Sequence, residues 1–474
     1  MKMKSKKTQL LGLSAMLPKD KNLYNLDSPR SISARKSYPD FLNFIYKKIK
    51  KPLPKENLSE YSEYIKLAEN KGYISFAKVI PGTLFYLPKG DFVFDAIHEY
   101  VGSQIRKEGF IKLTLPHFFR SDLNKNQKEM NPLEQLTVKF KGRMIGVSFG
   151  KNIFHRYASD PILFEYLRDK KIPIDPLKIY SPGFTFREEK KGELKRLKRP
   201  RTSYIEDYHI FTFDILKEIK PVFKLNSRIM NELCNKWFIS CDIEKKFFEE
   251  HQSYLHELVD ICQKPVAFNI LKARANYYTL QFKYSCGTSD GASIVFANLQ
   301  IDNINGKRFN IQIKDKGHIN ILHGNATGRM EKVFIALFDR AIKMKKESKK
   351  PMLPLWISPI QVRIIPVDNG FLNHCISISK KYINFGFRVD IDDRNTGLNK
   401  KIQLAEKEWI PYIIIIGKKE VDSNTITLRA RNKGQKIITT TELINKLENK
   451  IKKYPKIPQT LPSFVSKQID LSFL

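Results

Sequence analysis

Residues 179–213 decide the fold and read IYSPGFTFREEKKGELKRLKRPRTSYIEDYHIFTF. Both ends are rich in aromatic and β-branched residues, which predicts two strands joined by a loop over residues 190–201. The loop carries seven lysines and arginines and a single glutamate. Such a hairpin suits a nucleoside triphosphate beside an acidic polymer, because fixed cations bind phosphate groups well. A solvated basic hairpin with no ligand is the alternative.

The strands on either side of this loop each present a pair of polar side chains. Side chains two residues apart on a strand share a face, so Arg187 and Glu189 form one pair. Asp207 and His209 form the other pair on the second strand. A guanidinium, two carboxylates and an imidazole therefore meet in one hairpin, which favours a site for chemistry.

The composition describes a basic multidomain protein. The chain has 474 residues, 84 Lys and Arg against 49 Asp and Glu, a net charge of +35 and 42% hydrophobic residues. These values exclude disordered and collagen-like classes, and the apolar runs are too short to span a membrane. The excess of positive charge favours a polyanionic partner, nucleic acid first and a membrane surface second. A lysine-rich coding bias is the alternative explanation.

Cysteine usage indicates a reducing compartment. The five cysteines are odd in number and form no CxxC pair, which argues against a disulfide framework and a structural zinc knuckle. No convincing cleavage site follows the basic N-terminus. We therefore expect a cytoplasmic protein, with import into an organelle as the alternative.

Composition shifts divide the chain into three regions. Residues 1–60 form a basic, partly ordered lead, in which YPDFLNFIYKKIKK (38–51) is a candidate short helix. Residues 61–350 mix strands and helices without regular alternation, which predicts an antiparallel α+β domain. Two prolines after a charged helix end mark a boundary, and residues 351–474 form the third region.

Two helices are expected in the middle region. One begins at Asp91 and ends at Arg106, and the other begins at Gly328. On spacing alone, ordinary core-facing apolar stripes explain both helices.

The C-terminal region alternates regularly between strands and helices, which predicts a small, mostly parallel sheet with right-handed crossovers. The expected strands are 361–367, 387–391, 412–416 and 425–429, and the expected helices are 372–385, 398–409 and 440–451.

Several segments together resemble the class II aminoacyl-tRNA synthetases, and among them the threonyl-tRNA synthetases of the archaeal type. The three signature motifs correspond to KEGFIKLTLPHF (107–118), FREEKKGEL (186–194) and LHGNATGRMEK (322–332). PLWISPIQVRIIPV (354–367), DDRNTGLNKKI (392–402), PYIIIIGKKEV (411–421) and TITLRAR (425–431) resemble the anticodon-binding domain of that family. The resemblance covers about residues 61–450.

The resemblance implies an antiparallel-sheet catalytic domain followed by a small α/β anticodon-binding domain. It implies a homodimer that binds threonine, ATP and threonine tRNA, without a membrane association. It further implies a form without an N-terminal editing domain, so that another protein would correct mischarged seryl-tRNA.

The resemblance also assigns the residues that would bind ATP with its Mg²⁺. Arg187 would contact the α-phosphate and the amino-acid carboxylate, and Glu189 would hold the adenine. Arg199 would reach the terminal phosphates. Lys332 stands where the family uses arginine to hold the γ-phosphate, and lysine lacks the planar fork of that side chain. Arg187 and Lys332 are the expected catalytic residues.

A zinc site is implied at the amino-acid end. The family binds zinc with one cysteine and two histidines, and His209 and His323 occupy the two histidine positions here. Asp160 takes the place of the cysteine. Asp-His-His is an acceptable zinc set that leaves an open position for substrate, but its harder oxygen donor changes the preference among metals.

Other positions combine retained and altered contacts. Asp207 would bind the threonine hydroxyl, and Tyr278 and Gln300 would bind its amino side. Ser203 replaces a phenylalanine that stacks on adenine, and Ile205 replaces a polar residue. In the anticodon domain, the resemblance places base-reading side chains at Asn395, Arg429 and Arg431.

Three functions are consistent with these residues. The favoured one is ATP-dependent ligation of threonine to its tRNA through a threonyl-adenylate. A catalytically weakened or inactive paralogue that binds tRNA as an accessory protein is the alternative, supported by the changes at Asp160, Ser203, Ile205 and Lys332. The same fold loading proline or another amino acid is the third, and the histidine pair argues against it.

Overall fold

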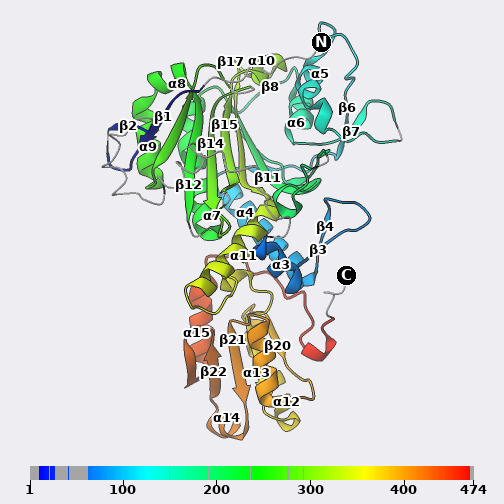
Figure 1. Cartoon of the computed structure of the whole chain (residues 1–474), viewed down its shortest axis with the longest axis vertical. Coiled ribbons are helices and arrows are strands. Elements are labelled where there is room, and N and C mark those ends of the chain that lie inside the picture. The colour runs from blue at the N-terminus through cyan, green and yellow to red at the C-terminus, as the bar shows by residue number, and fades with distance from the viewer. Residues whose placement is uncertain are drawn as a thin grey trace. The chain divides into compact units, whose positions relative to one another are not determined.

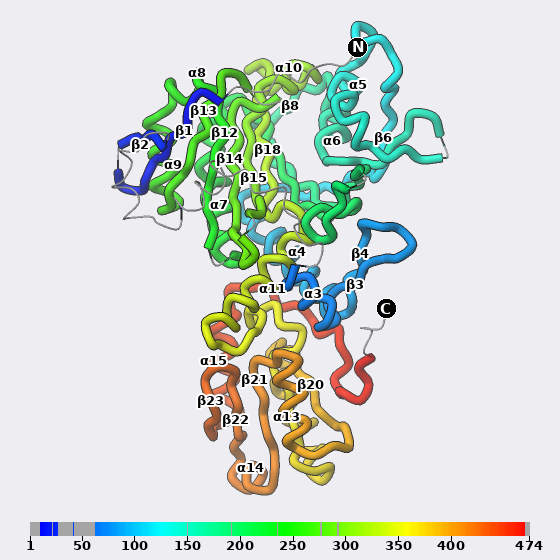
Figure 2. The backbone as a smooth tube through the Cα atoms, viewed as in Figure 1, coloured from blue at the N-terminus to red at the C-terminus, as the bar shows by residue number. Residues whose placement is uncertain are grey.

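The computed structural model describes residues 10–20, 22–26, 41, 62–148, 150–190, 192–234, 236–274, 277–291 and 293–469. The chain divides into two compact units, one of residues 1–60 and 101–336 and one of residues 61–100 and 337–474 (Figures 1 and 2). Residues 61–100 thus group with the C-terminal part, whereas the sequence analysis assigned them to the region 61–350.

The first unit is built on one eleven-stranded sheet, in the order β2-β1-β13-β12-β14-β15-β18-β11-β9-β5, with β10 also paired to β11. All pairings are antiparallel except β12 with β13 and β5 with β9. The predicted α+β class with an antiparallel sheet is confirmed. The strands are β1 Leu10–Met16, β2 Leu23–Asn25, β5 Ile111–Lys112, β9 Leu177–Tyr180, β10 Gly183–Phe186, β11 Thr202–Thr212, β12 Trp237–Glu244, β13 Val266–Leu271, β14 Tyr278–Gly287, β15 Ser293–Asp302 and β18 Asn320–Arg329.

The lead segment contributes strands to this sheet. β1 pairs antiparallel with β13, and its Leu13 and Ala15 are buried in a small apolar cluster with Phe41. Apart from Phe41, the candidate helix over residues 38–51 lies outside the described residues.

One face of the sheet is covered by helices. Helix α7 packs on β15 and β18, and Tyr208 of β11 donates a hydrogen bond of 2.9 Å to Asn226 of α7. Because neighbouring strand residues point to opposite faces, the odd-numbered residues of β11 point away from α7. The helices of this unit are α5 Pro132–Thr137, α6 Asp160–Leu167, α7 Ile215–Leu233, α8 Lys245–Glu250, α9 Gln252–Cys262 and α10 Asn305–Arg308.

Short elements pack beside the other face and enclose an apolar cluster that includes Leu163, Phe164 and Ile321. Phe164 is fully buried, and its ring stands edge-on to His209 and to His323. The short strands are β6 Phe118–Arg120 paired with β7 Ile153–His155, and β16 Gln312–Ile313 paired with β8 Lys171–Ile172 and β17 Gly317–His318.

The second unit contains a five-stranded sheet in the order β20-β19-β21-β22-β23. The pairings of β19 with β20 and β21 are parallel, but those of β22 are antiparallel. The expectation of a mostly parallel sheet is therefore wrong for half of the pairings, because β23 was not predicted and closes a hairpin with β22. The elements are β19 Val362–Pro366, α12 Leu372–Asn384, β20 Val389–Ile391, α13 Leu398–Lys407, β21 Tyr412–Ile416, α14 Lys418–Ser423, β22 Ile426–Ala430, β23 Gly434–Ile438 and α15 Thr440–Ile451.

Residues 61–100 bring α3 Glu63–Asn70, β3 Ile74–Phe76 and β4 Leu84–Tyr86 to this unit. The two predicted helices of the middle region are α4 Pro88–Lys107 and α11 Met330–Lys346. Helix α4 begins three residues before Asp91 because proline suits a first helical position. Helix α11 begins after Gly328 because β18 continues through Arg329. Among the described helices, none combines the length and apolarity that a membrane crossing requires.

Candidate active site

A cavity of about 670 Å³ opens on the face of the large sheet that α7 does not cover. Its floor is formed by residues of three adjacent strands, β11, β15 and β18. Nine of the ten site residues predicted in this unit line the cavity; only Tyr278 does not. The nine are Asp160, Arg187, Glu189, Arg199, Asp207, His209, Gln300, His323 and Lys332.

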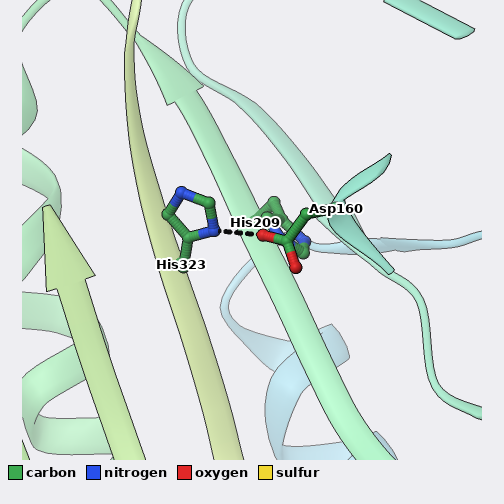
Figure 3. Close-up of side chains that lie close together, drawn as sticks. All are labelled: Asp160, His209 and His323. Carbon is green, nitrogen blue, oxygen red and sulfur yellow. Dashed lines mark hydrogen bonds and ion pairs between the residues drawn. The ribbon is translucent and has the colours of Figure 1, made fainter. Parts of the chain in front are cut away.

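Three of these side chains converge at one end of the cavity (Figure 3). His209 and His323 are directly opposite each other on β11 and β18, and Asp160 is the first residue of α6. Asp160 Oδ1 lies 2.6 Å from His323 Nδ1 and 3.3 Å from His209 Nε2. One donor atom from each residue lies within 4.8 Å of the other two. The pairing register of two strands therefore places the two histidines opposite each other, and the start of α6 adds Asp160 to the cluster.

The surroundings of this cluster fit a metal ion. His209 Nδ1 is buried without a hydrogen-bond partner among the described residues. His323 Nε2 lies 3.2 Å from the buried carboxylate of Asp302, a contact that is common behind metal-bound histidines. Two imidazoles and a carboxylate are a donor set that zinc accepts, with room for a fourth ligand.

The electrostatics of the cluster without metal are those of an ion pair. Burial opposes charge on His323, but Asp160 and Asp302 outweigh it and raise the His323 pKa to about 10. Burial also opposes charge on Asp160, but the two histidines hold the Asp160 pKa well below its usual range. A metal ion binding here would replace the imidazole proton of His323.

Polar side chains next to the cluster form a second small network. Asp207 accepts hydrogen bonds from Ser159 Oγ at 2.9 Å and from Asn325 Nδ2 at 2.6 Å. Burial and the charge of Asp160 raise the Asp207 pKa. Gln300 lies opposite His323 on β15. Tyr277 lines this end of the cavity, with its ring 5.5 Å from that of His323, whereas Tyr278 does not line it.

The other end of the cavity is rich in cations. The buried Glu189 carboxylate accepts hydrogen bonds from Arg143 at 2.5 Å and from Arg199 at 2.7 Å. Arg329 Nη2 lies 3.8 Å from the same carboxylate. The cavity lining holds six cations, Arg143, Arg187, Lys198, Arg199, Arg329 and Lys332, against three acids, Asp160, Glu189 and Asp207. Two of those acids are at the histidine end, so a strong positive potential remains here.

Arg187 and Lys332 differ in how the protein holds them. Arg187 donates a hydrogen bond of 3.1 Å from Nε to the Tyr157 carbonyl. Lys332 donates one of 2.7 Å from Nζ to the Val295 carbonyl. Burial, together with the charges of Arg329 and Arg187, lowers the Lys332 pKa to about 7.

The two substituted positions of the hairpin, Ser203 and Ile205, share one face of β11. Ile205 lines the cavity, and Ser203 is buried opposite Thr185 of β10. Tyr204 points to the opposite face, where its ring stands edge-on to Phe184 at 5.0 Å between centroids. Tyr204 therefore does not replace the missing adenine-stacking ring.

The three residues predicted to contact tRNA do not come together. Arg429 lies on β22 and Arg431 directly follows that strand. Both are at the end of the sheet where β19 and β21 begin. Asn395 follows β20, at the opposite end of the sheet. Arg429 pairs with Glu406 at 2.7 Å, and Arg431 donates to the Pro351 and Glu406 carbonyls. Arg429 and Arg431 also line a separate cavity of about 250 Å³.

Four residues of the site, Arg143, Tyr277, Asp302 and Arg329, were not predicted from the sequence. Asp302 and Arg329 could have been found, because each lies at the end of a strand at even spacing from a predicted residue, Gln300 or His323. Arg143 closes a 3₁₀ turn at residues 138–143 and lies 46 residues before Glu189, so no local pattern relates the two. The arrangement as a whole can hold a metal and an amino acid at one end and a polyphosphate at the other.

Most of the chain is similar in sequence to known proteins. Residues 361–450 match the anticodon binding domain family. The chain is 34% identical over 403 residues to the threonine–tRNA ligase of Pyrococcus horikoshii and 33% identical over 398 residues to that of Staphylothermus marinus. Each alignment covers 82% of this chain, and the chain spans 63% and 64% of those two relatives.

Solved structures show the same fold. The chain matches the RNA binding domain of threonyl-tRNA synthetase from Cryptosporidium parvum with a TM-score of 0.69 and 21% identity, over 82% of this chain and 98% of that one. It matches a putative threonyl-tRNA synthetase from Aeropyrum pernix with a TM-score of 0.65 and 16% identity, over 85% and 99%. A prolyl-tRNA synthetase from Cryptosporidium parvum follows at 0.62 and 16%, over 82% and 75%.

Proposed function

Because this chain is homologous to the threonine–tRNA ligases and carries an anticodon binding domain, we propose that it ligates threonine to threonine tRNA. The reaction uses ATP and proceeds through a threonyl-adenylate. The single observation that carries the proposal is the cavity with two unlike ends, one able to hold a metal and one strongly cationic.

At the cationic end, ATP binds with its Mg²⁺. Arg187 neutralises the charge that develops on the α-phosphate as the threonine carboxylate oxygen bonds to phosphorus and the bond to the leaving pyrophosphate breaks. Such preorganised charge is the main source of catalysis in phosphoryl and nucleotidyl transfer. Glu189 positions the adenine, and Arg199 contacts the terminal phosphates. The two arginines that bond to Glu189, Arg143 and Arg199, come from different segments of the chain. ATP binding would draw them away from that carboxylate. Lys332 completes the set from the start of α11.

At the other end, Asp160, His209 and His323 would hold Zn²⁺. The bound ion would act as a Lewis acid that accepts the amino and hydroxyl groups of the substrate. Asp207 accepts a hydrogen bond from the threonine hydroxyl, and Gln300 contacts the amino side. Tyr277, rather than Tyr278, is the tyrosine positioned to contact the substrate, since it lines the cavity.

Binding of tRNA belongs to the second unit, whose residues 361–450 match the anticodon binding domain. Arg429 on β22 and Arg431 directly after that strand form the stronger candidate surface. Asn395 would contribute only to binding a ligand that reaches both ends of the sheet. We further propose a symmetric homodimer, which light scattering at micromolar concentration would test, and a cytoplasmic location.

The accessory-protein alternative is weaker. It relies on the changes at Asp160, Ser203, Ile205 and Lys332, yet the cavity still holds nine predicted residues in one volume. A buried ion pair and a cationic cluster both cost stability. An inactive pocket would have no reason to keep them so close together.

Isotope exchange between ATP and pyrophosphate, measured with each of the twenty amino acids, tests the proposed function. We expect exchange with threonine, reduced about 100-fold or more in Arg187→Ala. Arg228→Ala is the matched control, because Arg228 forms an ion pair with Glu108 away from the cavity. Absence of exchange with every amino acid would favour the accessory protein.

A further inference from the structure

We infer that Arg329 binds the terminal phosphates of ATP and supplies the guanidinium that Lys332 lacks. This inference rests on the proposed function, because it names the residue that completes the nucleotide site. Neither the signature-motif resemblance nor the predicted site assigned any role to Arg329.

Arg329 lies on the face of the large sheet that lines the cavity. It is the last residue of β18, paired with Ile205 of β11, and it shares its face with His323 and Asn325. All four of these residues line the cavity. Six residues of strand, roughly 20 Å, separate Arg329 from His323, so the two mark opposite ends of one continuous floor.

A glycine directs this side chain into the cavity. Gly328 has a φ of +66°, and a Cβ there would lie 2.3 Å from the Phe296 carbonyl oxygen. Only glycine fits this close approach. The chain therefore bends between β18 and α11 in a way that places both Arg329 and Lys332 on the cavity wall.

The Arg329 guanidinium is held only loosely by the protein. Its side chain is 16% exposed, its Nη1 lies 3.5 Å from the Pro200 carbonyl, and its Nη2 lies 3.8 Å from Glu189. Both contacts are long for hydrogen bonds. Glu189 already accepts shorter hydrogen bonds from Arg143 and Arg199. The fork of Arg329 is thus available for a planar, bidentate contact with phosphate oxygens.

Lys332 is placed less favourably for that contact. Its ammonium is occupied by the Val295 carbonyl at 2.7 Å. The Lys332 pKa falls to about 7, whereas burial and Arg187 lower the Arg329 pKa only to about 10. At neutral pH Arg329 therefore keeps its full charge, and Lys332 keeps only part of it.

The test compares ATP with AMP, which lacks the terminal phosphates. Binding of each nucleotide is measured by calorimetry for wild type, Arg329→Gln, Arg329→Lys and the double variant Arg329→Gln/Lys332→Arg. We expect Arg329→Gln to weaken the binding of ATP by about tenfold to 100-fold, as for the loss of one charge-assisted contact. The binding of AMP should weaken by less than about twofold. Arg329→Lys should fall between, and the double variant should recover part of the ATP affinity.

Equal losses for ATP and AMP, or no loss for either, would overturn the inference. The Arg329→Lys variant preserves the charge, so it keeps the test decisive if Arg329→Gln does not fold. Exchange assays separate the two proposals. Threonine activation with an unchanged KM for ATP in Arg329→Gln removes this inference alone. Arg329-dependent ATP binding without exchange for any amino acid removes the proposed function alone, and wild type that binds no ATP overturns both.

Discussion

At the residue scale, the aspartate in the proposed metal site has a consequence that can be measured. A carboxylate oxygen is a harder donor than a thiolate, so Asp160 should hold zinc less tightly than a cysteine would. We expect close to one zinc per chain, lost in His323→Ala and His209→Ala, and held more tightly in Asp160→Cys. His318→Ala is the control, because His318 is exposed and contacts only Asn310 among the hydrogen bonds described for it.

Metal analysis after dialysis against graded chelator measures this order of affinities. Full-rate charging of threonine by exhaustively chelated protein would contradict a role for the metal.

Lys332 should make the stability of the fold depend on pH. The unfolded chain keeps this proton up to the ordinary pKa of 10.5, whereas the folded chain releases it near 7. Stability therefore rises with pH between these two values, because the unfolded state binds more protons there. Lys332→Met should be more stable than wild type at pH 6, and the difference should shrink by up to about 1.4 kcal/mol per pH unit above pH 7.

Denaturant melts at pH 6, 7, 8 and 9 would measure that difference. Lys345→Met, at an exposed position on the same helix, is the control for replacing a lysine by methionine. A Lys332→Met difference that is constant across pH would show that the side chain is solvated in the folded protein.

At the scale of elements, the junction between β18 and α11 depends on Gly328. Alanine there would have to adopt a φ of +66° and would bring its Cβ to 2.3 Å from the Phe296 oxygen. We expect Gly328→Ala to destabilise the protein by about 2 kcal/mol or more and to raise the KM for ATP, since Arg329 and Lys332 both move. Gly287→Ala is the control, because nothing lies within 4 Å of its added Cβ.

The elements also show how far the sequence could be interpreted. Strand 412–416 and helix 440–451 have their predicted bounds, because a run of isoleucines and a Thr439 capping box mark their ends. Strand β23 was missed because its residues are exposed and carry no apolar alternation. Four of the nine predicted cavity residues, Arg187, Glu189, Asp207 and His209, follow from two-residue spacing on strands. The other five, which are Asp160, Arg199, Gln300, His323 and Lys332, were implied by the resemblance of the signature motifs. Arg143 and Tyr277 were not predicted, since only tertiary folding brings them to the cavity.

At the scale of the whole molecule, the net charge of +35 and the region that matches the anticodon binding domain should make different contributions to the proposed tRNA binding. Dispersed lysines attract any RNA through its phosphates, which sets the salt dependence and carries no sequence information. Arg429 lines a cavity of about 250 Å³ and is only partly satisfied by Glu406, so it can contact a base edge.

We therefore expect Arg429→Ala to weaken the binding of threonine tRNA by about tenfold or more and to change the binding of non-cognate tRNA much less. Lys19→Ala, in the lead segment, should weaken both tRNAs alike and reduce the slope of log K against log salt by at most about one. Filter binding at several salt concentrations measures both effects. Equal effects of the two variants on both tRNAs would show that the C-terminal sheet does not distinguish sequences.

Fidelity is also a property of the whole molecule, because under the proposed function the cavity would select the amino acid and the second unit would select the tRNA. Valine lacks the hydroxyl that Asp207 and the metal would bind, so the cavity should reject it by about 10⁴-fold or more. Serine keeps the hydroxyl and lacks one methyl group, a difference worth about 1–3 kcal/mol, or about 10–200-fold. We expect measurable serine activation in pyrophosphate exchange.

Asp207→Ala should reduce the discrimination against valine and leave the ratio of threonine to serine activation within about threefold of the wild-type ratio, because the methyl contact does not involve this carboxylate. A serine rate as low as that of valine would mean that the cavity reads the methyl group by a contact stronger than packing.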